Sequence, residues 1–122
     1  DILVKKAPAC TIGVLAQAVK ELFRSDAPVQ IIGIRHGEKR YETLLTNEEC
    51  AKAEDLGSFY RVPCDKRGLN YDKYFVEGDT HRTKLSEFNS NNTRLLDVEQ
   101  VMEKLMELKY IRYRLAELGI KY

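Results

Sequence analysis

The chain has 122 residues, of which 43% are hydrophobic and 32% charged, and its formal net charge is +1. This length suits one small domain, and the composition is that of an ordinary soluble globular protein. The near-neutral charge argues against a general polyanion binder, so no nucleic-acid partner is expected. No apolar run is long enough to cross a bilayer and no signal-peptide core is present, which predicts a cytoplasmic protein without a membrane partner.

The first third of the chain predicts a strand, a helix and a second strand. Residues 2–4 are a short apolar run typical of a buried strand, and Pro8 ends that run. Thr11 offers an N-cap hydroxyl to a helix over residues 12–23, where apolar side chains recur at helical spacing. A second apolar run, residues 29–34, predicts a strand that leads into a charged turn.

The middle of the chain begins ambiguously, because residues 41–45 fit either a strand or a helix. Thr46 and Glu49 have the spacing of a capping box, in which each side chain accepts a hydrogen bond from the other residue's backbone N–H. A short helix is therefore expected to run to about Asp55, with Gly57 as its left-handed cap.

The remainder of the chain is extended, then irregular, then helical. Residues 59–63 look extended, whereas residues 64–92 show little periodicity, and such long irregular stretches are usually functional, mobile or packed on a partner. Asp97 and Gln100 form a second capping box at the start of a helix. The apolar residues that follow predict another helix toward the C-terminus.

The charged turn is the main candidate site, because it places an arginine and a glutamate around a glycine. The guanidinium of Arg35 could bind phosphate oxygens in a bidentate manner, and the carboxylate of Glu38 could accept hydrogen bonds from a vicinal diol such as a ribose. Gly37 would let the backbone turn tightly enough to aim both side chains the same way. The alternative is a solvated surface ion pair, which contributes at most about 1 kcal/mol.

The other reactive or aromatic residues favour structural roles. His36 and His81 have no neighbouring nucleophile in the sequence, so neither is assigned as a catalytic base. Four aromatic residues in the irregular stretch could stack on a base but more simply pack that stretch onto a core. They are Tyr60, Tyr71, Tyr74 and Phe75. Three widely spaced cysteines indicate reduced, mostly buried thiols rather than a disulfide framework or a zinc site. They are Cys10, Cys50 and Cys64.

Several signatures of catalysis are missing from the sequence. The residues after the first apolar run, 5–8, contain no glycine-rich dinucleotide fingerprint. No tyrosine is followed four residues later by a lysine, and no H-E-x-x-H, P-loop or G-x-S-x-G pattern occurs. The chain also begins at Asp1, which is not a methionine, and is interpreted as a fragment of something longer. Catalytic, cofactor-binding and metal-ligating residues are therefore not assigned.

Two strings carry a resemblance to a known family. They are R-H-G-E-K-x-Y-E-x-L over residues 35–44 and L-N-Y-D-K-Y-F over residues 69–75. Shorter matches lie at residues 1–4, 7–13, 60–63 and 89–93. Together they resemble bacterial polysaccharide-biosynthesis enzymes, which are extended short-chain dehydrogenase/reductases acting on UDP-N-acetylhexosamines. These include inverting UDP-N-acetylglucosamine 4,6-dehydratases with 5-epimerase activity and capsular UDP-glucose 4-epimerases.

The resemblance implies a mixed α/β fold and the C-terminal, substrate-binding part of such an enzyme, with the Rossmann core largely missing. Residues 1–122 are then a single substrate-binding domain in three consecutive parts. Residues 1–45 hold the strand-helix-strand and the nucleotide-clamp turn, 46–96 a capped helix and a lid-like irregular stretch, and 97–122 the final helices.

The resemblance also implies roles for the turn residues. Arg35 would contact the diphosphate and Glu38 the ribose hydroxyls of a UDP-N-acetylhexosamine used in capsule or O-antigen synthesis; Glu38 stands where other branches have Asp. NADP or NAD would be bound by the missing Rossmann domain and not by this chain alone. The full-length enzyme would be a homo-oligomer, and the isolated chain would not turn over. A non-catalytic nucleotide-sugar-binding or assembly module, or a degenerate remnant, is the alternative.

Overall fold

The computed structural model describes residues 1–64 and 85–122, which divide into two compact units. Unit 1 comprises Asp1–Ala7 and Arg40–Thr93, and unit 2 comprises Pro8–Lys39 and Arg94–Tyr122. The chain therefore leaves unit 1 after its first strand and returns to it at Arg40. Each unit is made of two segments that are distant in sequence, and backbone pairing joins the two segments within each unit.

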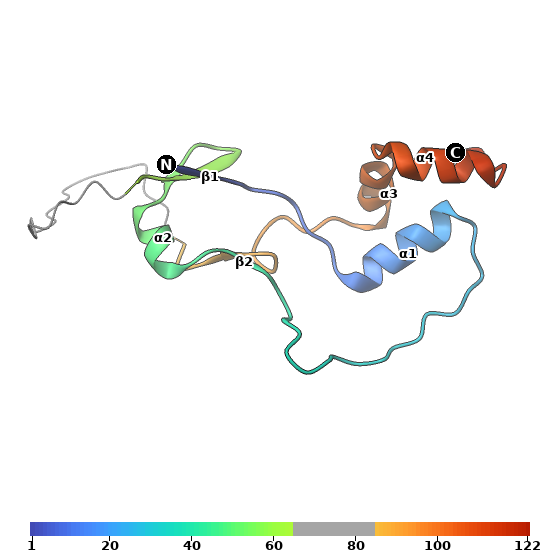
Figure 1. Ribbon diagram of the computed structural model, residues 1–122, viewed down its shortest axis with the longest axis horizontal. Helices are drawn as coiled ribbons and strands as arrows, with labels where there is room; N and C mark the ends of the chain where they lie inside the picture. Colours follow the sequence, from blue (N-terminus) through green and yellow to red (C-terminus); the bar gives the residue numbers. More distant parts are fainter. Residues whose placement is uncertain (65–84) are drawn as a thin grey trace, which may run out of the picture. The chain divides into compact units, whose positions relative to one another are not determined.

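Unit 1 contains two small antiparallel sheets (Figure 1). The first has the order β1-β4-β3 and is formed by β1 (Ile2–Lys5), β4 (Phe59–Val62) and β3 (Glu54–Asp55). The second pairs β2 (Thr43–Leu45) with β5 (Phe88–Asn89), with a register irregularity within β2. Of the ambiguous residues 41–45, Thr43–Leu45 form a strand, and the extended segment expected over residues 59–63 is confirmed as β4 over Phe59–Val62.

The helix of unit 1 is shorter than its sequence predicted. Helix α2 (Asn47–Lys52) begins with the expected capping box, in which Thr46 N–H donates to Glu49 Oε2 at 2.9 Å and Glu49 N–H to Thr46 Oγ1 at 3.4 Å. It ends before Asp55 because the chain joins the sheet as β3 immediately afterwards. Gly57, at φ +78°, therefore lies in the turn between β3 and β4, and its assignment as a helix cap was wrong.

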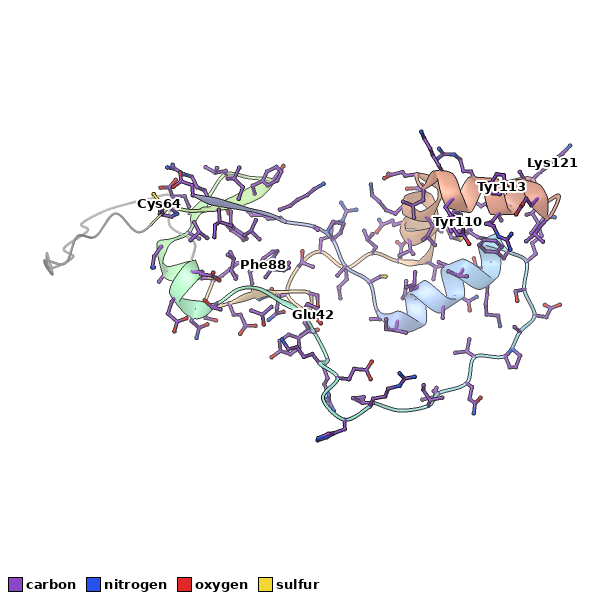
Figure 2. All side chains as sticks on the ribbon, viewed as in Figure 1. Glu42, Cys64, Phe88, Tyr110, Tyr113 and Lys121 are labelled. Carbon is purple, nitrogen blue, oxygen red and sulfur yellow. The ribbon has the colours of Figure 1, made fainter. Side chains whose placement is uncertain are left out.

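The core of unit 1 draws side chains from both sheets and from α2. Its buried members are Leu45, Cys50, Ala53, Tyr60, Val62 and Phe88. The ring of Phe88, labelled in Figure 2, meets that of Tyr60 at a centroid distance of 5.1 Å and an interplanar angle of 70°, an edge-to-face arrangement. This contact links β5 of the second sheet to β4 at the centre of the first.

Strand β1 forms where it was predicted but is not buried. Its pairing places Val4 opposite Tyr60 on the core face, whereas Leu3 lies opposite Arg61 on the other face. Because β1 is an edge strand with one partner, Leu3 remains 62% exposed.

Ion pairs join the strands of the three-stranded sheet on both of its faces, from Arg61 on one face and from Lys6 on the Tyr60 face. Arg61 reaches Asp1, the residue before β1, at 2.9 Å and Glu54 of β3 at 3.0 Å, so the guanidinium of the central strand contacts a carboxylate on each side. Lys6 donates to Asp55 at 2.5 Å and lies over the Tyr60 ring, with Nζ 4.2 Å from the ring centroid. The hydrogen bond from Lys6, together with the Gly57 N–H, lowers the pKa of Asp55.

Unit 2 is helical and has capped helix starts. Helix α1 (Ile12–Leu22) begins where Thr11 Oγ1 accepts a hydrogen bond from Val14 N–H at 3.2 Å, so the predicted N-cap is confirmed. Helix α3 (Val98–Met106) begins with the predicted second capping box, formed by Asp97 and Gln100. Helix α4 (Lys109–Glu117) follows toward the C-terminus, also as expected.

Packing and backbone bonds join the two segments of unit 2. Helix α1 packs against α3, and the buried side chains of the unit are Ala18, Leu22, Val101 and Leu115. Ala9 donates its N–H to the Arg94 carbonyl at 3.0 Å and accepts from the Leu96 N–H at 2.8 Å. Arg112 donates to the Met106 and Glu107 carbonyls, which gives partners to the free carbonyl groups at the end of α3.

We expect Phe88→Ala to lower the free energy of unfolding of unit 1 by about 3–5 kcal/mol, because it removes a buried ring and leaves a cavity against Tyr60. Urea unfolding followed by circular dichroism measures this loss. Phe59→Ala is the matched control, since Phe59 is 39% exposed on the neighbouring strand. Equal destabilisation by the two variants would contradict the central role of Phe88.

Candidate functional site

Residues 35–38 form a β-turn. The N–H of Glu38 donates to the carbonyl of Arg35 at 3.1 Å, and Gly37, the third residue of the turn, has φ +83°. A positive φ at this position is typical of a type II turn and strains any residue with a side chain. The glycine is therefore needed for the backbone geometry, as its place in the sequence predicted.

The carboxylate of Glu38 bonds to the backbone rather than to the arginine side chain. Its Oε2 accepts the backbone N–H of Arg35 at 2.9 Å, and no Arg35–Glu38 ion pair occurs in the part of the chain that the structure describes. The surface ion-pair interpretation of these two residues is thus wrong. The backbone bond was missed, although the same three-residue spacing correctly predicted the capping box at Thr46 and Glu49.

The guanidinium of Arg35 is available for a ligand. Arg35 is exposed, and within residues 1–64 and 85–122 its side chain has neither a hydrogen bond nor an ion pair. Every residue from 26 to 44 is exposed, so the turn is not embedded in a packed wall. Lys39, four residues after Arg35 in the same unit, is a further exposed cation. An exposed turn with unpaired guanidinium donors can bind an anion by charge-assisted hydrogen bonds.

The strand expected over residues 29–34 is not formed. These residues are extended but carry no strand pairing with any described segment, as the plain trace in Figure 1 shows. Their side chains are exposed on both faces; Ile31 is 92% and Ile32 72% exposed. An apolar, β-branched run has the composition of a strand, but a strand also requires a partner for its backbone groups.

Of the remaining candidate residues, Tyr60 is packed in the core, His36 is exposed and the others lie outside the described part of the chain. Tyr60 is buried against Phe88, so its predicted packing role is confirmed. His36 is exposed and has no partner among the residues described. The other aromatic and histidine candidates, Tyr71, Tyr74, Phe75 and His81, lie outside the described residues.

The three cysteines are free thiols in different surroundings. Cys50 is buried, and burial raises its pKa, which keeps the thiol protonated and unreactive. Cys10 is half-buried and Cys64 exposed, so the expectation of mostly buried thiols holds for Cys50 alone. Within residues 1–64 and 85–122, no cluster of histidine, cysteine and acidic residues could hold a metal ion. None of the helices described has the length and hydropathy that a bilayer-crossing segment requires.

Comparison with protein families assigns the chain to a class. Residues 1–64, just over half of the chain, match the family model described as polysaccharide biosynthesis protein. Residues 65–112 match the model described as polysaccharide biosynthesis protein C-terminal. The chain belongs to the polysaccharide biosynthesis protein family, which confirms the resemblance seen in the turn and its flanking motifs.

Several curated relatives share about half of their aligned residues with this chain. A UDP-glucose 4-epimerase of Rickettsia felis is 52% identical over 115 residues, covering 94% of this chain and 34% of the relative. Proteins of the same name in Rickettsia canadensis and Rickettsia bellii are each 51% identical with the same coverage. The chain thus spans about a third of the length of the curated relatives it matches.

We expect Ile31→Asp to reduce self-association of the chain. Residues 29–34 are uncharged, free of proline and rich in β-branched side chains, and such exposed segments drive pairing between copies. Sedimentation velocity over a concentration series measures the association. Ile12→Asp is the control, because Ile12 is an 80% exposed isoleucine on a helix. An unchanged concentration dependence in Ile31→Asp would contradict the prediction.

Proposed function

We propose that this chain is the UDP-sugar-binding part of an NAD(P)-dependent enzyme of polysaccharide biosynthesis. The observation that carries the proposal is the exposed Arg35 guanidinium, which lacks a protein partner among the described residues and stands on a glycine turn. The sequence similarity to UDP-glucose 4-epimerases also supports the proposal.

Arg35 is proposed to bind the diphosphate. A guanidinium keeps its charge at any physiological pH and presents paired N–H donors that match two phosphate oxygens. No carboxylate in the described chain competes for these donors, since Glu38 directs Oε2 to the backbone. The second carboxylate oxygen, Oε1, has no partner among the described residues, and it is proposed to accept a hydrogen bond from a ribose hydroxyl.

The connection between β1 and α1 does not fit the phosphates of a nicotinamide dinucleotide. The connection from β1 to α1 runs through Pro8 and contains no glycine, whereas the usual phosphate-binding turn after a first strand needs glycines for close backbone approach. NAD or NADP is therefore proposed to bind to a Rossmann domain outside this chain. The apolar residues 29–34 are the proposed contact with that domain, because they are exposed here on both faces.

The relatives are named UDP-glucose 4-epimerases, which favours 4-epimerisation of a UDP-sugar as the proposed reaction over 4,6-dehydration with inversion at C5. In either reaction this chain would hold the UDP part of the substrate. Binding energy from that remote group would orient the sugar carbons for reaction elsewhere in the enzyme. Capsule or O-antigen precursors are the proposed products.

We expect the chain to bind UDP and Arg35→Ala to weaken that binding about tenfold to a hundredfold, the loss of a charge-assisted contact. Titration followed by NMR chemical shifts measures the affinity and shows whether the variant remains folded. Arg94→Ala is the matched control, since Arg94 is an exposed arginine of the same unit. Equal affinities of Arg35→Ala and the unmodified chain would overturn the phosphate contact.

We expect no product when the 122-residue chain is incubated with UDP-glucose or UDP-N-acetylglucosamine and either NAD or NADP. The reason is that the chain supplies neither a dinucleotide fingerprint nor a Tyr-x-x-x-Lys pair. Chromatography of the nucleotide sugars measures the outcome. Turnover by the chain alone would contradict its assignment as a binding part only.

A further inference from the structure

We propose that Glu38 is a positioning residue for Arg35, in addition to any contact it makes with a ribose. The inference rests on the proposed binding of a phosphate group by Arg35. Two hydrogen bonds join the residues: Glu38 N–H to the Arg35 carbonyl at 3.1 Å, and Arg35 N–H to Glu38 Oε2 at 2.9 Å. Glu38 thus bonds to Arg35 through both its backbone and its side chain.

The surroundings make this side-chain bond decisive for the turn. Residues 26–44 are all exposed, so no buried contact holds the turn in one conformation. Gly37 permits the turn, but a glycine also leaves the unbound backbone more conformations than other residues do. The bond to the N–H of Arg35 restrains the backbone of the residue whose guanidinium is proposed to bind the ligand. Less conformational freedom then remains to be lost on binding.

The two oxygens of Glu38 separate its two roles. Oε2 is engaged in the turn, whereas Oε1 has no partner in the described residues. A ligand without a ribose therefore tests the role of Oε2 alone. Inorganic pyrophosphate is such a ligand, because it presents phosphate oxygens to Arg35 and has no diol.

A positioning role for Glu38 and simple electrostatic repulsion predict opposite changes in pyrophosphate affinity when the Glu38 carboxylate is removed. A carboxylate near a bound phosphate repels it, so removing the charge should tighten pyrophosphate binding if Glu38 has no effect on the turn. If Glu38 positions Arg35, Glu38→Ala should instead weaken pyrophosphate binding, by about threefold to tenfold, as loss of one hydrogen bond would.

The experiment is titration of the full 122-residue chain with pyrophosphate, followed by ¹H–¹⁵N NMR spectra. We expect weaker binding in Glu38→Ala and recovery of most of the affinity in Glu38→Gln, whose side-chain carbonyl still accepts the Arg35 N–H. The Arg35 amide proton should shift in the alanine variant and return toward its original position in the glutamine variant. Glu42→Ala, the same change of charge at an exposed residue four positions later, should leave pyrophosphate binding unchanged.

The outcomes distinguish the two proposals. If Glu38→Ala binds pyrophosphate as tightly as the unmodified chain or more tightly, while Arg35→Ala loses binding, the positioning role is overturned and the phosphate contact stands. If Arg35→Ala also binds unchanged, the phosphate contact itself fails, and the positioning role fails with it.

Discussion

The edge-to-face contact between Tyr60 and Phe88 is the interaction on which unit 1 depends. Tyr60 comes from the central strand of the three-stranded sheet and Phe88 from the two-stranded sheet, so one ring pair gives both sheets a common core. Because side chains alternate along a strand, burying Tyr60 places its neighbour Arg61 on the opposite face. There Arg61 meets the carboxylates of Asp1, the residue before β1, and of Glu54 in β3. The ring contact thus fixes which face of β4 is buried in the core and which carries the Arg61 ion pairs.

The turn at residues 35–38 is held by different forces from those of the core. It has no buried side chain, and its conformation rests on a glycine at positive φ and on hydrogen bonds within the turn. Such an arrangement keeps the Arg35 guanidinium accessible, which suits recognition of a charged ligand by a loop. Its weakness is that the long arginine side chain must be ordered on binding, which costs affinity. A small free energy of binding is therefore consistent with the proposed role of this chain as one part of a larger site.

The candidate site could be located from the sequence but not described by it. The spacing of Arg35, Gly37 and Glu38 predicted a turn that carries both candidate side chains, and the structure has that turn. The sequence left open whether the two side chains pair with each other. In the structure they do not, and the Glu38 carboxylate instead accepts the backbone N–H of Arg35. A side chain with several acceptors nearby in sequence has several possible partners, and only the backbone conformation selects among them.

The sequence by itself determined the local features of this protein. The helix caps at Thr11, Thr46 and Asp97 each join a side chain to a backbone N–H three residues later. Because both groups are close in sequence, the sequence alone predicted these caps. Tertiary structure decided the rest. It ended α2 at Lys52, placed Gly57 in a hairpin and left residues 29–34 unpaired. The physical reason is that a strand exists only where a distant segment supplies hydrogen-bonding partners, and a short apolar run does not specify that segment.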